Sequence, residues 1–422
     1  MQAHALVLTP MAQRTKSLAA PRRYVQGPGV LKEIGAHIAS FGGKKALLIG
    51  GKSALASVRD IITKSCQDAG IGTVVELFGN PAKVKYGPEC CEEEINRLAD
   101  LAKANNCDTI ISAGGGKAID TGKNSAANIG ALKIVVPTIA ATDAPTSALS
   151  VLYDPKTHAF KSVSYYPTNP DLVIVDTEIV AKAPARMQCS GIGDGFSKKY
   201  EGEANVRSGG KNCLVKALKQ EGTTMTALAL CRLGNDIYRE YGVAAMLSNL
   251  KGVPSPAFEW LIEANVLLSG LGFESCGLAA AHAINDGLTV LEPKMDPFPQ
   301  YHGELVHFGT LTQMVLEDRP AKEILDVMEW SHAVGLPVCF EDIGLREPTD
   351  EDLMKAAQAC VSTADAVPTY YLNDMYFKVT AKMVVDALKT VDSLGRTVKT
   401  PRLKLPAPAP YPWAEEFKRM GH

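Results

Sequence analysis

The sequence lacks the features that mark several classes of protein. No apolar run approaches the roughly 20 residues of a membrane span, so we expect no membrane contact. The formal net charge is −2 and the pI is about 6.5, so no basic field favours nucleic acid. Repeats at solenoid periods are also missing. The composition, 46% apolar and 21% charged, is typical of a globular protein, and 422 residues suffice for two domains.

Cysteine is present ten times, but never with the CxxC or CxxxxC spacing of a structural zinc site. Many cysteines stand in apolar settings, such as Leu230-Cys231-Arg232, which predicts reduced core residues of an intracellular protein.

Acidic residues are missing from the N-terminus, where the first is Glu33. This segment contains Arg14, Lys16, Arg22 and Arg23. A short disordered extension is the favoured interpretation, and a transit peptide is the alternative. We therefore expect a cytoplasmic protein, with a mitochondrial location as the alternative.

The first half alternates short aliphatic runs with helical patterns. This alternation predicts an α/β domain with a parallel sheet covered on both faces. Strands are expected at 46–49, 73–78, 109–112, 134–136 and 172–175, with helices at 53–69, 90–104 and 117–128.

The pattern becomes helical after about residue 180, with almost no strand candidates up to residue 394. Helices are expected at 195–204, 225–240, 256–271 and 378–394. The predicted organisation is an extension (1–22), an α/β domain (23–180), an all-α domain (181–399) and an extended proline-rich tail (400–422).

A glycine-rich turn, Gly114-Gly115-Gly116-Lys117, joins a predicted strand to a predicted helix. Glycines let the backbone approach a diphosphate, the helix N-terminus favours the anion, and Lys117 adds charge. The turn matches neither the GxGxxG motif nor a Walker loop. The alternative to diphosphate binding is a tight connection that binds no ligand.

A second polar loop, 137–147, follows the next predicted strand and contains Asp143. In open α/β sheets, ligands bind at the carboxyl ends of strands, and these hydroxyls suit a ribose or a polyhydroxyl substrate. A solvated turn is the alternative.

Asp194, His282 and His302 are candidate metal ligands, because three N/O ligands suit a zinc ion that keeps one position open. Asp194 lies between two glycines, and we expect it at the opening of a helix, where an N-cap is the alternative. His282 is surrounded by small residues, and a satisfied core histidine is its alternative. His302 follows a proline-rich loop, and a surface histidine is its alternative.

Several motifs resemble the glycerol dehydrogenases of the iron-containing (group III) alcohol dehydrogenase superfamily, which are related in fold to dehydroquinate synthase. The resemblance is collinear from about Arg23 to Lys399. The motifs are Gly114–Lys123, Pro137–Ala140 with Thr142–Pro145, Gly191–Asp194, Gly272–Ser275 and Tyr301–Glu304.

The resemblance implies a Rossmann-like nucleotide domain, a helical metal-binding domain and an active site between them. It implies zinc bound by Asp194, His282 and His302, with Asp143 near a small polyol substrate. It also implies a nicotinamide cofactor, NAD or NADP, and a homo-oligomer, an octamer or smaller. The implied cofactor-binding residues are Gly51, Gly115, Gly116, Lys117, Thr138, Ala141, Ser147, Leu149 and Tyr153.

The sequence departs from this family at three positions. Iron-dependent relatives carry a further His where this chain has Lys198, which favours the three-ligand zinc subgroup. Gly51 replaces an Asp that would bind the adenosine ribose, so with Lys52 beside it a 2′-phosphate can be accepted. Ala141 replaces a family Ser.

The resemblance therefore implies zinc-dependent oxidation of glycerol to dihydroxyacetone, or the reverse, with a nicotinamide cofactor, and we expect this function. Action on other small 1,2-diols, ketones or aldehydes is the first alternative. A cyclising synthase that uses NAD transiently, and a helical interaction protein with a vestigial nucleotide site, are the others. No basic cluster for a substrate phosphate is evident, which disfavours dihydroxyacetone phosphate.

Overall fold

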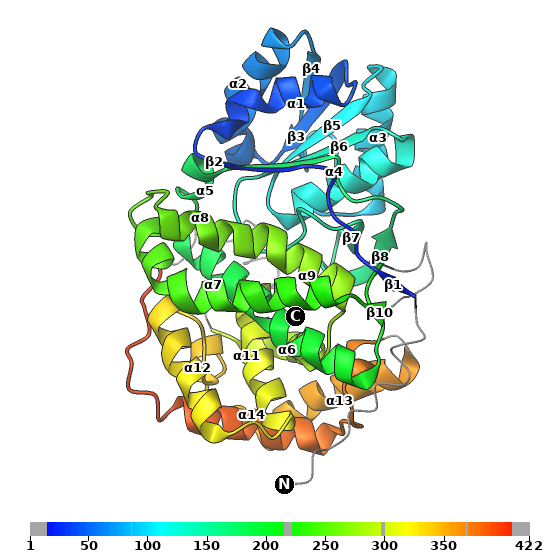
Figure 1. The fold of residues 1–422 in the computed structure, drawn as a ribbon. Helices are drawn as coiled ribbons and strands as arrows, with labels where there is room; N and C mark the ends of the chain where they lie inside the picture. Colours follow the sequence, from blue (N-terminus) through cyan, green and yellow to red (C-terminus); the bar gives the residue numbers. More distant parts are fainter. Residues whose placement is uncertain (1–14, 86, 215–221, 297–299, 368–369, 407–422) are drawn as a thin grey trace.

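The structure is a computed structural model that describes residues 15–85, 87–214, 222–296, 300–367 and 370–406. The predictions for the first 14 residues and for the tail beyond residue 406 lie outside these ranges. An α/β part forms one end of the molecule and a helical part forms the other (Figure 1). Among the described helices none is by itself long and apolar enough to cross a membrane, and the pair that meets this criterion jointly is bent by 102°.

A six-stranded sheet with all its strands parallel organises the first part, as the alternating pattern predicts. The strand order is β2-β9-β6-β5-β3-β4. The strands are β2 (Tyr24–Gly27), β3 (Lys45–Gly50), β4 (Gly72–Leu77), β5 (Thr109–Gly114), β6 (Leu132–Pro137) and β9 (Leu172–Asp176). Strand β2 was not predicted; it pairs with β9 at the edge of the sheet.

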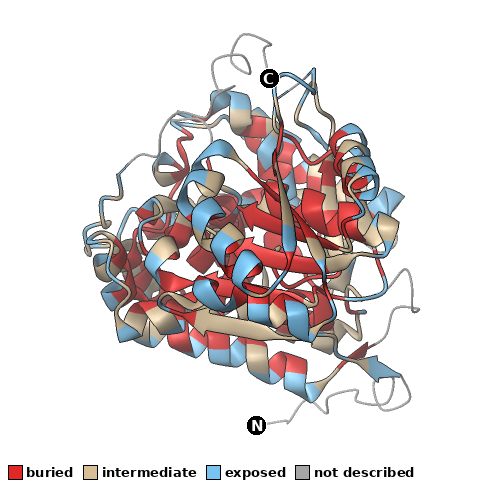
Figure 2. Ribbon diagram, turned by 90° about the horizontal axis from the view of Figure 1, so that it is seen from above, coloured by how far each residue is buried: buried red, intermediate tan, exposed pale blue. Residues whose placement is uncertain are grey.

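Helices cover both faces of this sheet because alternate strand residues point to opposite sides. Leu48, Ile111 and Ile134 pack on one side, against helices α1 (Ile34–Ser40) and α2 (Lys52–Asp68). Leu47 and Ile110 pack on the other, against α3 (Glu92–Ala104) and α4 (Gly116–Ile129). The inner strands β3, β5, β6 and β9 therefore form a buried layer between helices (Figure 2).

A second short sheet was also not predicted. It is an antiparallel hairpin of β7 (Leu149–Tyr153) and β8 (Phe160–Tyr165). Strand β8 is largely exposed or half-buried, so its sequence lacks the aliphatic run that identifies a core strand. The two-residue strands β1 (Lys16–Ser17) and β10 (Gly222–Thr223) pair in parallel.

The second part is helical, as predicted. Its helices are α5 (Thr177–Val180), α6 (Ala185–Ser208), α7 (Met225–Asn249), α8 (Pro256–Glu263), α9 (Ser269–Cys276), α10 (Ala280–Leu288), α11 (His302–Leu316), α12 (Ala321–Val334), α13 (Asp350–Ala366) and α14 (Ala381–Gly395). Helices α6 and α7 are longer than the periodicity indicates, and the helix predicted at 256–271 is divided. A π-helical turn (Ala264–Leu268) joins α8 to α9, and short 3-10 turns complete the part (Thr289–Lys294, Glu341–Ile343, Tyr371–Asp374). A further 3-10 turn, Val30–Glu33, precedes α1 in the α/β part.

The prediction that Asp194 opens a helix is wrong, because α6 begins nine residues earlier, at Ala185. Glycine normally disfavours a helix interior, which explains the misplaced boundary. Here the glycines serve close packing instead. A Cβ on Gly193 would lie 2.2 Å from the carbonyl oxygen of Gly303, and one on Gly191 would lie 2.0 Å from that of Ala140.

The reverse contact is tighter still: a Cβ on Gly303 would lie 1.7 Å from the carbonyl oxygen of Ser190. Helix α11 therefore meets α6 backbone to backbone at its first turn, where His302 begins the helix. The position of His302 depends on this contact.

Replacing Gly303 with Ala is expected to force α6 and α11 apart and to lower the free energy of unfolding by about 3 kcal/mol. Thermal and urea unfolding would measure the loss. Gly51→Ala is the matched control, because nothing lies within 4 Å of the added Cβ and φ is −66°. Equal stability of the two variants would contradict the packing argument.

Candidate active site

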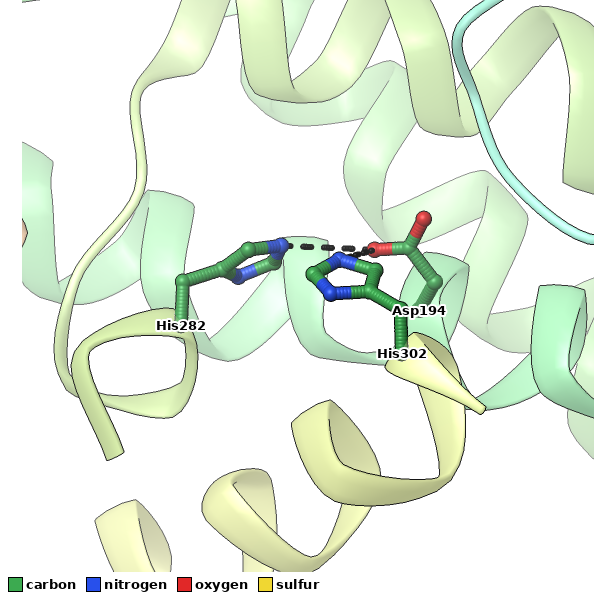
Figure 3. A group of neighbouring side chains, drawn as sticks. All are labelled: Asp194, His282 and His302. Carbon is green, nitrogen blue, oxygen red and sulfur yellow. Dashed lines mark ion pairs between the residues drawn. The ribbon is translucent and has the colours of Figure 1, made fainter. Parts of the chain in front are cut away.

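Asp194, His282 and His302 come together although they are remote in the chain (Figure 3). Helix α6 provides the carboxylate, α10 provides His282 and the start of α11 provides His302. Their ligand atoms all lie within 4.8 Å of one another. The Oδ1 atom of Asp194 lies 3.3 Å from Nε2 of His282 and 3.9 Å from Nε2 of His302.

Solvent reaches this group from one side. Asp194 is 1% exposed and His282 is 7% exposed, whereas the His302 side chain is 44% exposed. An open side is what a metal site needs if a substrate is to reach the ion.

Glu201 holds the ring of His282 from behind. Its carboxylate lies 2.7 Å from Nδ1 of His282 and accepts backbone N–H groups of Ala279 and His282. Burial opposes a charge on His282, but the carboxylates of Glu201 and Asp194 together outweigh burial and raise the pKa of His282 to about 9. In the neutral form that binds a metal, Nδ1–H is donated to Glu201 and Nε2, on the side of Asp194, carries the lone pair.

Lys198 lies at the centre of the same group, one helical turn after Asp194. Its Nζ donates to Oδ1 of Asp194 at 2.6 Å and lies 3.2 Å from Nε2 of His282. It also pairs with Oδ2 of Asp143 at 3.1 Å. Burial opposes the ammonium charge, yet the carboxylates of Asp143 and Asp194 raise the pKa of Lys198 above its usual value.

Asp143 reaches this group from the α/β part, on the loop after β6. Its Oδ2 also accepts a hydrogen bond from Ser269 at 3.1 Å. The loop is held to the helical part at Ala140, whose N–H donates to Gln188 and whose carbonyl accepts from Asn265. The loop that carries Asp143 is thus placed against α6 by buried hydrogen bonds.

The predicted nucleotide residues from Gly51 to Thr138 lie at the carboxyl ends of neighbouring strands, whereas Leu149 and Tyr153 lie on β7 of the hairpin. The chain passes from β3 to β4 on one side and then to β5 on the other, so a topological switch point lies between β3 and β5. Gly51 follows β3, Gly114 ends β5 with a φ of +147°, and Thr138 follows β6. A Cβ on Gly115 would lie 2.7 Å from Ile139, so the turn is compact.

Lys117, at the start of α4, is held beside this turn. Its Nζ forms an ion pair with buried Glu89 at 2.6 Å and lies 5.2 Å from the centre of the Tyr153 ring. Glu89 also contacts Nδ1 of His158, on the hairpin, at 2.8 Å. The contacts bring Lys117 and Tyr153 together, two of the predicted cofactor-binding residues.

Two buried charged groups hold the loop that leads into β7. Lys123 donates to the carbonyls of Ala144, Ser147 and Leu149 and to the Ser147 hydroxyl, and it forms an ion pair with Asp120. Ser147 is fully buried, so its hydroxyl serves this network. Ala141 is half-buried on the same loop.

Glu274 holds the loop from the helical side. It accepts the N–H of Ala148 at 2.7 Å and the side-chain amide of Asn169 at 2.5 Å. Burial raises the pKa of Glu274 to about 7.

Sequence reasoning did not assign roles to Glu201, Lys123, Glu89 or Glu274. Glu201 follows Asp194 by seven residues, two helical turns, so a helix drawn over the full length of α6 would have placed both on one face. The other three depend on contacts distant in the chain, for which the sequence contains no local signal. Metal-binding, catalytic and cofactor-binding roles of the predicted residues stay predictions.

Comparison with known proteins shows the family of this chain. Residues 21–177 match the family described as iron-containing alcohol dehydrogenase. The chain is 39% identical to glycerol dehydrogenase of Escherichia coli over 379 residues, 90% of this chain and 97% of that protein. It belongs to the iron-containing alcohol dehydrogenase family. It is therefore an alcohol oxidoreductase.

Two further members of the family give the range of similarity. The chain is 39% identical to glycolaldehyde reductase of Halobacterium salinarum, covering 91% of this chain and 99% of that protein. The crystal structure of glycerol dehydrogenase from Schizosaccharomyces pombe superposes with a TM-score of 0.82 at 32% identity, covering 93% and 96% of the two chains. The predicted fold class, an α/β part with a helical part, is confirmed by these structural relatives.

Glu201→Gln is expected to weaken Zn²⁺ binding about 10-fold to 100-fold, because the amide cannot hold His282 as the carboxylate does. Competition with a chromophoric chelator would measure the affinity. Glu203→Gln is the control: Glu203 lies on the same helix and pairs with the half-exposed Arg232. An unchanged affinity in the Glu201 variant would show that Glu201 does not orient a ligand.

Proposed function

We propose that this protein is a zinc-dependent glycerol dehydrogenase that uses NAD or NADP. The single observation that carries the proposal is the convergence of Asp194, His282 and His302, with ligand atoms within 4.8 Å of one another. Glycerol dehydrogenases among the relatives, at 39% and 40% identity, support the substrate.

The donor set fits a divalent ion with an open coordination position. One carboxylate and two imidazoles suit zinc, and Glu201 fixes the orientation of His282 as the carboxylate behind a ligand does. The family name refers to iron, so the choice of zinc rests on the three-ligand set. When bound, the metal supplies Lewis-acid polarisation of the substrate hydroxyl.

In the proposed reaction, glycerol loses a hydride from its secondary carbon and a proton from its hydroxyl. The products are dihydroxyacetone, the reduced nicotinamide and one proton. Asp143, half-buried beside Lys198 and Ser269, would bind the polyol hydroxyls. The exposed side of His302 gives the substrate access.

The turn after β5 fits a dinucleotide. Gly114 adopts a left-handed conformation that side chains rarely adopt, and the N-terminus of α4 follows it at the switch point of the sheet. Gly115, Gly116 and Lys117 would contact the diphosphate. Thr138, Ala141, Leu149 and Tyr153 would line the nicotinamide side, while Ser147 supports the loop from within.

Reduction of small aldehydes is the second candidate function. The relative named glycolaldehyde reductase is as similar to this chain as the glycerol dehydrogenase of Escherichia coli, and its match covers 99% of its length. The same residues would serve, because aldehyde reduction is the reverse hydride transfer.

The test is the absorbance of the reduced nicotinamide, followed with glycerol and with 1,2-propanediol, and in reverse with dihydroxyacetone and glycolaldehyde. Chelation is expected to abolish activity and added Zn²⁺ to restore it. Full activity after removal of all metal would refute the proposal, and aldehyde reduction without glycerol oxidation would favour the second candidate.

His302→Ala is expected to lower kcat/KM for glycerol at least about 1000-fold, because the metal contributes several kcal/mol to catalysis. The fold should persist, since His302 is half-exposed at the end of a helix. Circular dichroism would check the fold. His37→Gln, at a histidine that contacts Arg23 in the α/β part, is the control.

Gly51→Asp is expected to raise the ratio of NAD to NADP activity at least about tenfold, because a carboxylate there binds the ribose hydroxyls and repels a 2′-phosphate. The position accepts a side chain, since nothing lies within 4 Å of an added Cβ. Kinetics with both cofactors would measure the ratio, with Gly51→Ala as control. A wild-type enzyme that already strictly prefers NAD would contradict the role given to Gly51.

A further inference from the structure

Lys198 has no role in the mechanism above, yet it lies within hydrogen-bonding distance of two proposed metal ligands. We propose that its ammonium group is an internal cation that competes with the divalent ion for Asp194 and His282. Metal loading then requires Lys198 to leave these two residues. The inference rests on the proposed metal site but concerns its affinity, which is measured without the reaction.

Geometry makes the two cations mutually exclusive at this position. Nζ of Lys198, Oδ1 of Asp194 and Nε2 of His282 form a triangle with sides of 2.6, 3.2 and 3.3 Å. An ion bonded to both ligand atoms at about 2.0 Å lies within about 4 Å of Nζ, on whichever side it binds. On the near side the ion and the ammonium group overlap, and on the far side they repel each other with little water between them.

The ammonium group also satisfies the ligands as a metal would. Asp194 is 1% exposed, and an unpaired carboxylate buried to that degree is strongly destabilising. Lys198, itself 1% exposed, neutralises this charge and so stabilises the protein without metal. The divalent ion must therefore replace an interaction that already exists, which lowers its net affinity.

Asp143 provides the partner that Lys198 keeps when it leaves Asp194. Its Oδ2 lies 3.1 Å from Nζ, on the loop from the α/β part. The ring of Phe273, 5.6 Å from Nζ, covers the same region. Lys198 thus moves between the metal ligands and the carboxylate on the substrate side without being exposed to water or losing its ion pair.

The test compares Zn²⁺ affinity in the full-length protein after chelation and dialysis, by competition with a chromophoric chelator. Lys198→Met removes the charge, and Lys198→Gln removes it while keeping a hydrogen-bond donor in case the Met variant does not fold. Both are expected to bind Zn²⁺ at least tenfold more tightly than wild type. Lys199→Gln is the matched control: Lys199 is next on the helix but its Nζ lies over the ring of Tyr200.

Unchanged affinity in Lys198→Gln would overturn the inference, because Lys198 would then not compete with the ion. Weaker affinity would overturn it as well, since Lys198 would then help to hold the ion as a neutral amine. The outcome is separate from the proposed function. A wild-type enzyme that oxidises glycerol but binds Zn²⁺ as tightly as the Gln variant refutes only the inference. A tenfold gain in a protein without glycerol activity refutes only the function.

Discussion

Compensation of buried negative charge is the constraint on which this structure depends. Asp194 and Glu201 lie on α6 and are almost fully buried, and Asp143, on the loop after β6, shares the ammonium group of Lys198 with Asp194. Each needs a cation or a set of donors, because an isolated buried carboxylate is costly. The charge of Glu201 is compensated by His282 and two backbone N–H groups, and that of Asp194 by Lys198 and the two imidazoles. The group is thus a polar centre that the apolar helices of the second part enclose.

Glycine in α6 makes this enclosure possible. Side chains at Gly191 and Gly193 would collide with the backbone of the loop after β6 and of α11, so their absence lets three segments meet around Asp194. Helix α6 therefore does two things that usually conflict. It presents polar residues to a reactive centre, and it approaches its neighbours more closely than ordinary side chains permit. The helix tolerates the low propensity of glycine because tertiary packing, rather than propensity, stabilises most helices in proteins.

Much of the fold was predictable because it follows from local patterns. The strands β3, β5, β6 and β9 are aliphatic runs that end at glycine, proline or polar residues, and α2, α3 and α4 carry one apolar face. The exceptions have physical reasons. Strand β8 has no buried face and so no alternating apolar pattern, and the glycines inside α6 resemble the boundary of a helix. Of the site, Asp194, His282 and His302 were singled out by residue type and resemblance. Glu201 and Lys123 were not, since their roles arise only from contacts in three dimensions.

Lys198 shows why the chemistry of a residue cannot be inferred from its position alone. Sequence reasoning treats Lys198 only as the loss of a metal ligand, because the resemblance implies a further His at this position in iron-dependent relatives. In the structure it is a charged group placed between Asp194 and Asp143, which belong to different parts of the fold. A neutral residue at this position would leave both carboxylates without their ammonium partner, so the protein without metal would be less stable. The ammonium group compensates the charge of the two carboxylates when no metal is bound. Because it pairs with both, it also links the metal site to the loop that is proposed to bind the substrate.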